Sequence, residues 1–492
     1  MRPPSVFPPA VTTSGTPYPR RSREERIRAR LRRLDHGIQH GIRRVATLVL
    51  LFPLLLLLGS AIPYVLQAPL LLGYGCLVLA STIVIFYLAY TRYADPAVHP
   101  PRACRRRGTD LFVPLPAQPT VSFLVAVRNE ESGIEACVHS MVAGDLDGVQ
   151  VIVVDDASTD GTPDILRQLA RELPIEVLFL EENVGKKRAL VRAMERAKGE
   201  VIAFTDSDCV LAADALSRCV TALVRHPELG AVSGHARALN AEQSILSRAQ
   251  DVWYEGQFRV IKAAESVFGA VACVSGPLAV FRRDAIYNYL PAWAEDRFLG
   301  AEFRFATDRQ LTGYVLGQRY RGRDLKRRHA DSPFVRDVDY PELAWRTSYV
   351  RSARVWTTVP DRLRPFLRQQ IRWKKSFIRN IFFTGTFIWR RGAGAAALYY
   401  VHVLWVLAAP VLVIRHLLWA PLNGLWLVTW LYLSGVVIKG FFWGMAFKFG
   451  ADGSSRWRYR LVMSLLSSVL LSWLLPYAAV TIRRTTWFRG AS

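Results

Sequence analysis

Val201–Val210 reads VIAFTDSDCV, a short apolar run that ends abruptly in Asp206, Ser207 and Asp208. Such a run is typical of a buried parallel strand, which delivers its polar residues to the carboxyl end, where open α/β sheets bind ligands. Two carboxylates at this spacing can share a divalent cation and the diphosphate that the cation neutralises. Taken alone, the pair fits a surface turn equally well, so its interpretation depends on the segments around it.

Strand-like and helical segments alternate on both sides of this stretch. Apolar runs at 121–127, 149–154 and 175–180 are separated by helical patterns, and polar residues follow each run. This alternation predicts an α/β domain over residues 115–345, built on a doubly wound sheet with polar groups gathered at the strand ends.

The polar residues at these strand ends suit a nucleotide. Glu130, Asp155 and Asp156 follow the first two runs, where acidic groups can accept hydrogen bonds from a base or a ribose. Lys186 and Lys187 stand at a predicted helix start, where they can meet phosphate charge. Each loop alone fits a solvated turn, whereas four loops in register favour a nucleotide site.

The composition indicates a membrane protein. The 492 residues are 51% hydrophobic, and 64 Lys plus Arg against 40 Asp plus Glu give a net charge of +24, which indicates an anionic partner. The apolar runs 46–66 and 70–90 are each long enough to cross the hydrocarbon core, so residues 46–91 predict a transmembrane hairpin. Because the basic residues concentrate beside such runs, we expect membrane lipid and not nucleic acid as the partner.

The first 45 residues form a basic arm. Its beginning is rich in Pro, Ser and Thr, which predicts a largely disordered segment, and ten arginines lie between Arg20 and Arg44. A basic segment just before a membrane span is typical of the cytoplasmic side. The arm and the domain that follows the hairpin are therefore expected in the cytoplasm, in a multi-pass protein of the cell membrane.

The C-terminal part returns to the membrane. Residues 346–395 mix aromatics, arginines and short apolar runs, which predicts amphipathic helices in the membrane interface. Two transmembrane helices are expected within 396–449. The run 461–482 has arginines on both sides and contains Pro476, which favours an interfacial or re-entrant helix over a crossing one, and 483–492 is expected as a cytosolic tail.

Lys439 falls inside the second of these two spans. A charge within a span is functional by default, and a polysaccharide path would combine it with aromatic surfaces such as Trp405 or Trp430. A lysine that extends to the cytoplasmic face is an equally good interpretation.

Six short motifs extend the nucleotide interpretation. They are Asp155-Asp156, Gly185-Lys186-Lys187, Asp206-Ser207-Asp208, Ser275-Gly276-Pro277-Leu278, Thr307-Asp308-Arg309-Gln310-Leu311-Thr312 and Gln369-Gln370-Ile371-Arg372-Trp373. Together they resemble the processive, membrane-embedded synthases of glycosyltransferase family 2, and hyaluronan synthases most closely, over residues 121–489. The resemblance implies a GT-A-like doubly wound mixed sheet, inserted between transmembrane and interfacial helices.

The resemblance and the chemistry of the side chains give each motif an expected role. The roles are nucleotide binding for Glu130, Asp155, Asp156, Lys186, Lys187, Asp206, Gln369 and Arg372, metal binding for Asp206 and Asp208, acceptor contact for Ser275, Gly276, Pro277 and Trp373, and catalysis for Asp308. Two positions depart from the family pattern: Lys187 replaces an Arg, and Thr307 replaces an acid.

Sugar transfer from a UDP-sugar requires these residue types. The leaving diphosphate is stabilised by cations and a divalent metal, here Mg2+ or Mn2+, and a carboxylate takes the proton of the acceptor hydroxyl. A metal-bound diphosphate leaves as an anion, so a second acid is not required, in contrast to glycoside hydrolysis. Inversion at the anomeric carbon is what the resemblance implies.

The expected function is a polymerising inverting glycosyltransferase, which adds UDP-GlcNAc and UDP-GlcA to a growing polysaccharide and moves the product through its own helices. The alternatives are a single-sugar chitin- or cellulose-like synthase and a non-processive transferase that acts on a lipid carrier. A catalytically inactive scaffold is disfavoured because Asp206, Asp208, Asp308 and Arg372 are all present. Residue types do not fix the sugar, since discrimination depends on pocket shape.

Overall fold

A computed structural model describes residues 69–100, 112–450 and 455–484. The basic arm at 1–45, the first span of the predicted hairpin and the tail residues 485–492 lie outside this part of the chain. The described residues belong to one compact unit.

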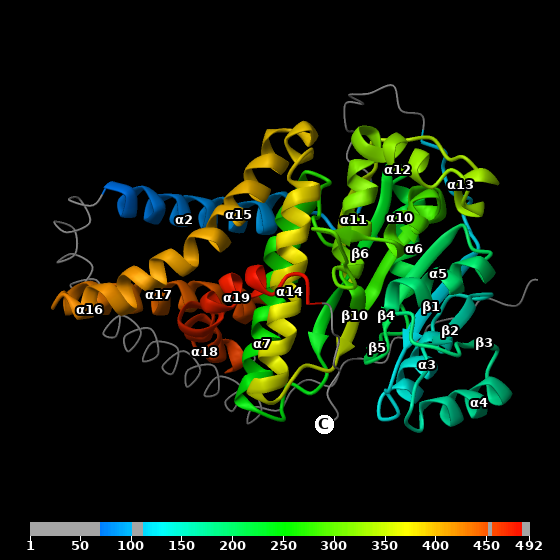
Figure 1. The fold of residues 1–492 in the computed structure, drawn as a ribbon, viewed down its shortest axis with the longest axis horizontal. Coiled ribbons are helices and arrows are strands. Elements are labelled where there is room, and N and C mark those ends of the chain that lie inside the picture. Colours follow the sequence, from blue (N-terminus) through cyan, green and yellow to red (C-terminus); the bar gives the residue numbers. More distant parts are fainter. Residues whose placement is uncertain (1–68, 101–111, 451–454, 485–492) are drawn as a thin grey trace, which may run out of the picture. The chain divides into compact units, whose positions relative to one another are not determined.

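An eight-stranded mixed sheet forms the centre of this unit (Figure 1). Its strands, in spatial order, are β3 (Ile175–Phe179), β2 (Gln150–Asp155), β1 (Val121–Val127), β4 (Val201–Asp206), β7 (Ala279–Arg282), β6 (Leu229–Ala238), β10 (Arg346–Thr357) and β5 (Cys209–Leu211). β7 is antiparallel to β4 and β6, and β10 is parallel to β6. The carboxyl ends of β1, β2, β4, β6 and β10 therefore meet at one edge, as the pattern of polar strand ends predicts.

Helices cover both faces of the sheet. One face packs against α3 (Ile134–Val142), α4 (Thr162–Glu172) and α6 (Ala215–Arg225), and the other against α5 (Lys186–Arg196), α9 (Arg283–Ile286), α10 (Leu290–Ala294) and α11 (Thr307–Gly317). All seven residues of β1 are buried, and six of them are apolar, as is typical of a strand covered on both faces. The smaller elements are α8 (Ala263–Val267), α12 (Arg323–Arg328), α13 (Pro333–Arg336) and the hairpin of β8 (Arg297–Phe298) and β9 (Ala301–Glu302).

The structure corrects the predicted domain boundary at 345. Residues 346–357 are strand β10 and not an interfacial helix, and β10 pairs with β6 on one side and β5 on the other. Its sequence, RTSYVRSARVWT, alternates β-branched or aromatic residues with Arg and Ser, so the arginines hide a strand pattern. The sheet therefore extends to Thr357.

Four described helices are long and apolar enough to cross a membrane, judged by length and composition. They cover Gly73–Arg92, Ala393–Leu422, Trp426–Met445 and Ser455–Val480, and include α2 (Pro69–Tyr87), α15 (Ala393–Val413), α16 (Ala420–Leu422), α17 (Trp426–Gly450), α18 (Tyr459–Leu465) and α19 (Leu474–Val480). In Figure 1 they lie on one side of α7 (Ile245–Glu255) and α14 (Leu363–Thr384), and the sheet lies on the other.

The last of these helices is broken. A π turn at Leu466–Leu470 and a 3-10 turn at Leu471–Trp473 separate α18 from α19, which run in different directions in Figure 1. α18 packs against α7 and α17, whereas α19 packs against α14. A bend is thus present in the segment 461–482, and its position relative to the membrane stays a prediction.

Several aromatics assigned to the membrane interface belong to the protein interior instead. Phe366, Phe377 and Phe387 are at most 7% exposed, because they pack between α14 and its neighbouring helices. Phe382 and Trp389, in contrast, are 66% and 56% exposed. α14 is therefore a buried link between the sheet domain and the apolar helices over much of its length.

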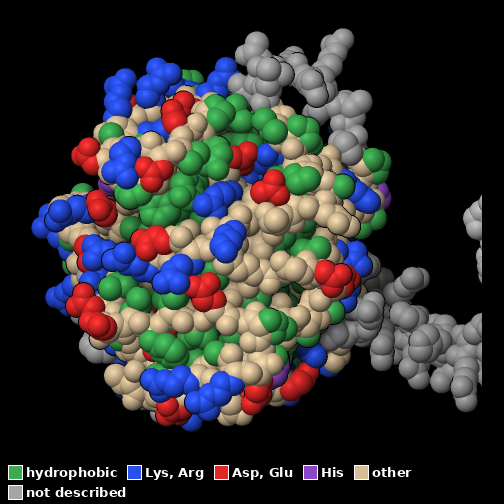
Figure 2. All heavy atoms as spheres, turned by 90° about the vertical axis from the view of Figure 1, so that its right-hand side faces the viewer, with side chains coloured by type: hydrophobic (Ala, Val, Ile, Leu, Met, Phe, Trp, Pro, Cys, Tyr) green, Lys and Arg blue, Asp and Glu red, His purple; other side chains and the backbone are tan. Residues whose placement is uncertain are grey.

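The face of the unit shown in Figure 2 belongs to the sheet domain. Lys and Arg side chains are interspersed there with Asp and Glu, and apolar patches lie between them. Such a mixture of both signs is typical of a solvent-exposed surface.

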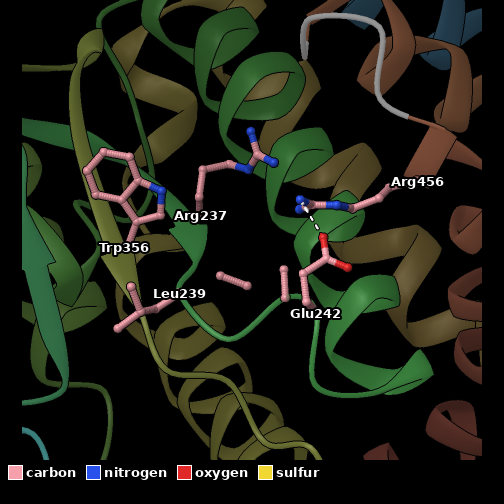
Figure 3. Close-up of a pocket in the computed structure, with 7 residues that line it drawn as sticks. Arg237, Leu239, Glu242, Trp356 and Arg456 are labelled. Atoms are coloured by element: carbon pink, nitrogen blue, oxygen red, sulfur yellow. Dashed lines mark ion pairs between the residues drawn. The ribbon is translucent and has the colours of Figure 1, made fainter.

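A cavity of about 430 Å³ lies at the ends of β6 and β10. Figure 3 shows Arg237 and Trp356 from the sheet on one side, with Glu242 and Arg456 opposite. Asp251 ion-pairs with Arg237 at 2.7 Å and with Arg456 at 2.9 Å, and Glu242 pairs with Arg456 at 2.7 Å. Neighbouring carboxylates thus neutralise both arginines of this cavity. The ion pairs connect the sheet to the apolar helices.

Candidate active site

Hydrogen bonds between turns hold the ends of β1, β2 and β4 side by side. The Asn129 backbone N–H donates to Ser158 Oγ at 2.9 Å, and Asn129 Oδ1 accepts from the Thr159 N–H at 2.8 Å. The Ser207 hydroxyl donates to Glu130 Oε2 at 3.2 Å. Asn129 has a φ of 51°, in the left-handed region that Asn tolerates better than most residues. The acids that follow different strands are therefore brought together at one edge.

Asp155 and Asp156 are buried and hold loops. Asp155 accepts hydrogen bonds from the backbone N–H and the hydroxyl of Ser158. Asp156 accepts from the N–H groups of Val184 at 2.8 Å and Gly185 at 3.0 Å. Burial raises the pKa of Asp156, and these backbone hydrogen bonds oppose the increase. The pair thus shapes the loop in front of α5, and its contact with a nucleotide stays a prediction.

Lys186 and Lys187 begin α5 but point to different partners, since adjacent helical residues face different directions. Lys186 Nζ ion-pairs with Asp206 Oδ1. Lys187 Nζ donates to Asp296 Oδ2 at 3.1 Å, to Phe303 O at 2.9 Å and to Gln310 Oε1 at 2.6 Å. All three Lys187 donors are engaged inside the protein, which contradicts the predicted phosphate contact of Lys187.

Lys187 belongs to a buried network around Asp296. The second Asp296 oxygen accepts from Arg379 Nη2 at 2.7 Å and Nε at 3.2 Å. Burial lowers the pKa of Lys187 to about 8, and Asp296 opposes that decrease. The network ties α5 to α11 through Gln310 and to α14 through Arg379, and these helices also carry Lys186, Asp308 and Arg372. It is therefore placed to fix the mutual position of three functional side chains.

We expect Asp296→Asn to lower the free energy of unfolding by about 3–5 kcal/mol, because it leaves two buried cations without their carboxylate. The apparent melting temperature of the purified protein measures this loss. The control is Glu195→Gln, which removes a carboxylate from an exposed pair with Arg192 and is expected to cost less than about 1 kcal/mol. Equal melting temperatures of the two variants would contradict a structural role for Asp296.

Asp206, Asp208 and Cys209 offer ligand atoms within 4.8 Å of one another. Burial and the Asp206 carboxylate raise the pKa of Asp208 to about 6. Burial also raises the pKa of the Cys209 thiol, which donates to Asp208 Oδ1 at 3.5 Å, far above its ordinary value. The remaining donors are carboxylate oxygens, which suit hard cations such as Mg2+ and Mn2+. The site therefore fits the expected metal.

Lys186 and Arg372 bring positive charge to the same carboxylates. Burial lowers the pKa of Lys186, but Asp206 and Asp208 more than offset this effect, so the net pKa is raised. Burial lowers the pKa of Arg372, and the same two carboxylates oppose it. Two cations from α5 and α14 thus flank the carboxylate pair, as the binding of a metal-diphosphate group requires.

Asp308 stands in the first turn of α11 and joins the segment that contains Gly276. Asp308 Oδ2 accepts from the Gly276 N–H at 3.3 Å, and Asp308 Oδ1 accepts from the Arg309 N–H at 2.8 Å. A Cβ atom on Gly276 would lie 2.7 Å from Asp206 Oδ2. Gly276 therefore separates the predicted base from the predicted metal ligand, and a side chain there would displace the Asp206 carboxylate.

Hydrogen bonds also fix the rest of the predicted acceptor segment, which lies between β4, β6 and α11. The Thr205 hydroxyl donates to Pro277 O at 2.8 Å, and the Ser275 N–H donates to Ser233 Oγ at 3.2 Å. The Thr312 hydroxyl donates to Asp308 O at 2.8 Å and accepts from the Val274 N–H at 2.9 Å. These bonds fix the segment between β4, β6 and α11.

The motif on α14 brings Arg372 within electrostatic range of Asp206 and Asp208. Trp373 is 36% exposed, and its ring stacks on Trp253 with a centroid distance of 5.5 Å. Gln369 Oε1 is a buried acceptor without a hydrogen-bond partner among the described residues. An open aromatic surface and an unused acceptor are features of a ligand site, and the acceptor and nucleotide roles of these two residues stay predictions.

Sequence reasoning missed Cys273 and Asp296. The Cys273 thiol donates to Asp308 Oδ2 at 3.3 Å, and burial with the nearby Asp308 charge raises the pKa of Cys273 to about 11. A single cysteine has no pattern that a sequence reveals, although Cys273 stands two residues before the acceptor motif. No sequence motif contains Asp296. Its partner Arg379 could have been noticed, because it lies two helical turns after Arg372 on α14.

Residues 122–290 match the family model described as Glycosyl transferase family 2. This part of the chain is therefore similar to family 2 glycosyltransferases. The mixed sheet with helices on both faces is GT-A-like, as the sequence predicts. The predicted members of its site that the structure brings together are Glu130, Lys186, Asp206, Asp208, Gly276, Asp308 and Arg372.

The curated relatives of this part of the chain are named N-acetylglucosaminyltransferases. The N-acetylglucosaminyltransferase of Rhizobium meliloti (strain 1021) is 35% identical over 274 residues, which cover 55% of this chain and 57% of that protein. The N-acetylglucosaminyltransferase of Azorhizobium caulinodans is 34% identical over 270 residues, which cover 54% of this chain and 62% of that protein. The chain thus spans about three fifths of the length of the curated relatives it matches.

The chain is also similar to a solved glycosyltransferase structure. Mannosyltransferase PcManGT from Pyrobaculum calidifontis, in complex with GDP-Man and Mn2+, has a TM-score of 0.47 and 21% sequence identity, and the alignment covers 83% of this chain and 98% of that chain.

Proposed function

We propose that the protein is a membrane-embedded, processive, inverting glycosyltransferase that polymerises UDP-sugars and moves the product across the membrane. UDP-GlcNAc and UDP-GlcA are the proposed donors, and the growing polysaccharide is the acceptor. The observation that carries the proposal is the constellation in which Gly276 joins Asp308 to Asp206, with Lys186 and Arg372 beside the same carboxylates.

Each residue of this constellation has a separate role in the proposed reaction. Lys186 and Arg372 bind the diphosphate and stabilise the negative charge that develops on it as the bond to the sugar breaks. Asp308 accepts the proton of the attacking hydroxyl, and the Gly276 N–H orients the carboxylate. Asp206 and Asp208 would hold Mg2+ or Mn2+, which supplies further stabilisation of the leaving diphosphate when bound. Asp155 and Asp156 shape the pocket on the nucleotide side.

The apolar helices support the membrane part of the proposal. Four described helices are long enough to cross a bilayer, and α14 links them to the site because it carries Arg372 and packs against both α11 and α19. We place the protein in the cell membrane as a multi-pass protein with its sheet domain in the cytoplasm. Trp373 provides the surface on which an acceptor sugar stacks.

A single-sugar synthase is the second candidate. It is favoured by the curated relatives, which are named N-acetylglucosaminyltransferases and match more than half of this chain. Such an enzyme would use the same carboxylates and cations, and it would differ in requiring UDP-GlcNAc alone.

UDP release by the detergent-purified protein distinguishes these candidates. The donors UDP-GlcNAc, UDP-GlcA and UDP-Glc are supplied singly and in pairs with Mn2+ or Mg2+. Polymer formed only from UDP-GlcNAc with UDP-GlcA supports the two-sugar enzyme, whereas turnover with UDP-GlcNAc alone supports the single-sugar synthase. We expect EDTA to abolish UDP release and added Mn2+ or Mg2+ to restore it, because the Asp206 and Asp208 carboxylates suit a hard cation. UDP release that persists in EDTA contradicts the metal proposal.

A further inference from the structure

Two buried groups donate hydrogen bonds to one oxygen of Asp208, the second carboxylate of the candidate metal pair. The Thr357 hydroxyl donates to Asp208 Oδ1 at 3.2 Å, and the Cys209 thiol donates to the same oxygen at 3.5 Å. Thr357 is 6% exposed, and Cys209 is fully buried. Solvent therefore has little access to take the place of either donor.

The register of the sheet brings these two donors to Asp208. Thr357 is the last residue of β10, and it lies opposite Cys209 in the antiparallel pair of β10 and β5. Residues that lie opposite each other in such a pair project their side chains on the same face of the sheet, with Cβ atoms about 5 Å apart. Because Asp208 directly precedes Cys209, both side chains reach its carboxylate.

The backbone at the end of β10 is held independently of the Thr357 side chain. The Thr357 carbonyl accepts from the Leu239 N–H at 2.9 Å, and the Thr358 N–H donates to Asp208 O at 3.2 Å. Strands β6 and β5 also pair with β10 on its two sides. A substitution of Thr357 can therefore remove the hydroxyl while the strand keeps its place.

The two carboxylates of the metal pair are supported by different elements. Asp206 ion-pairs with Lys186 of α5, whereas Asp208 is held by Thr357 of β10. A hydrogen bond to a charged carboxylate is stronger than one between neutral groups, so it restricts the rotation of that carboxylate. When a group that orients a metal ligand is removed, metal affinity or activity typically falls by about 10–100-fold.

The geometry points to Thr357 as a positioning residue of the metal site: its hydroxyl holds the Asp208 carboxylate in the orientation that binds the divalent cation, with support from the Cys209 thiol. This inference rests on the proposed function, because it takes Asp208 as a ligand of Mg2+ or Mn2+. Thr357 acts through Asp208 and is not itself a ligand. The role adds β10 to the elements that build the site.

Binding of Mn2+ in the absence of a sugar nucleotide tests this role. The full-length protein in detergent is titrated with Mn2+ alone, and the concentration of free Mn2+ is followed by electron paramagnetic resonance. We expect Thr357→Val to raise the Kd for Mn2+ by about tenfold, because the carboxylate must then be oriented at the moment of binding. Asp208→Asn is expected to weaken binding further, which assigns the measured ion to this site.

Two substitutions of Thr357 separate positioning from a role in the strand alone. Valine keeps the branched shape that suits a strand and loses the hydroxyl, whereas serine keeps the hydroxyl and loses the branch. We therefore expect Thr357→Ser to bind Mn2+ with nearly wild-type affinity and Thr357→Val to bind it weakly. A role confined to the strand predicts the reverse order, and that order would overturn the proposal.

Thr358→Val is the matched control. Thr358 is exposed, and it contacts Asp208 through its backbone N–H, which the substitution keeps. Equal Mn2+ affinities of Thr357→Val and Thr358→Val would overturn the proposal. If Thr357→Val does not fold, Thr357→Ala removes the same hydroxyl without placing a methyl group beside the carboxylate, and wild-type Mn2+ affinity of Thr357→Ala would be equally decisive against the proposal.

The Mn2+ dependence of UDP release supplies a second readout. Thr357→Val is expected to need more Mn2+ for its half-maximal rate and to reach the wild-type maximal rate when Mn2+ is in excess, since the side chain acts on metal binding alone. A maximal rate that stays low in excess Mn2+ would show damage beyond the metal site and contradict the proposed role.

These outcomes are separable from those of the donor assay. A protein that binds Mn2+ through Asp208 and Thr357, yet releases no UDP with any donor, would overturn the proposed function and leave the role of Thr357 intact. A protein that releases UDP in EDTA and does not bind Mn2+ would overturn the role of Thr357 while retaining a glycosyltransferase.

Discussion

Asp308→Asn is expected to lower the rate of sugar transfer by about 1,000-fold, within the range that a general base contributes. The substitution removes the carboxylate proposed to accept the proton of the acceptor hydroxyl, and it keeps the size of the side chain. The asparagine oxygen can still accept from the Gly276 N–H, so the backbone of the acceptor segment keeps its position. UDP affinity is expected to change by less than about threefold, because the proposed diphosphate contacts come from Lys186, from Arg372 and from the metal that Asp206 would hold.

Single-turnover transfer and UDP binding by calorimetry, both with Mn2+, measure the two quantities. Asp164→Asn is the matched control, since Asp164 is an exposed residue of α4 that pairs with Arg167 at 2.6 Å. Its transfer rate should equal that of the wild type. Transfer by Asp308→Asn at a rate close to that of Asp164→Asn would remove Asp308 from the catalytic role.

Much of the sheet follows from local sequence. The strand at 121–127 has the predicted bounds, and α4 follows the second strand as the predicted alternation requires, because apolar pattern and turn residues specify the same structure. The strand that ends at Asp206 was predicted from its apolar run and the polar residues after it. Where periodicity and burial agree over several residues, the sequence alone is sufficient.

The strand β10 and the contacts of Lys187 could not be predicted from the sequence, and the reason is the same for both. Arg346–Thr357 becomes a strand because β6 and β5 are available on both sides, and its arginines conceal the pattern in the sequence. Lys187 follows Lys186 directly, yet contacts Asp296 and Gln310, which are more than 100 residues away in sequence. Long-range partners decided both outcomes, and a single sequence does not reveal such partners.

In the candidate site, too, local sequence predicts the residue types, whereas long-range contacts required the structure. The residue types at Asp206, Asp208, Asp308 and Arg372 were predicted from motifs, because the chemistry restricts them to carboxylates and cations. The contacts that position these residues were not predicted, since Gly276 and Cys273 meet Asp308 only through folding. The sequence thus identifies the chemical groups of the site, and the fold supplies their geometry.

Gly276→Ala tests that geometry directly, and we expect it to lower the transfer rate by about 100-fold, as a displacement of about 1 Å at a reacting centre does. The new Cβ atom would lie 3.0 Å from Asp206 Oδ1 and 2.7 Å from Asp206 Oδ2, and the second distance is shorter than real Cβ atoms adopt. Asp206 must then move, and its ion pair with Lys186 and its metal-binding oxygens move with it.

The matched control for Gly276→Ala is Gly144→Ala, where the nearest atom to the added Cβ is Ala213 O at 3.5 Å, an ordinary van der Waals distance. Titration of the transfer rate with Mn2+ separates two causes of the loss. A displaced Asp206 raises the Mn2+ concentration needed for half-maximal rate in Gly276→Ala, whereas general unfolding lowers the maximal rate and the melting temperature together. If Gly276→Ala transfers sugar as fast as Gly144→Ala, then Asp206 does not need the space beside Gly276, and the close approach of the acceptor segment to Asp206 has no part in catalysis.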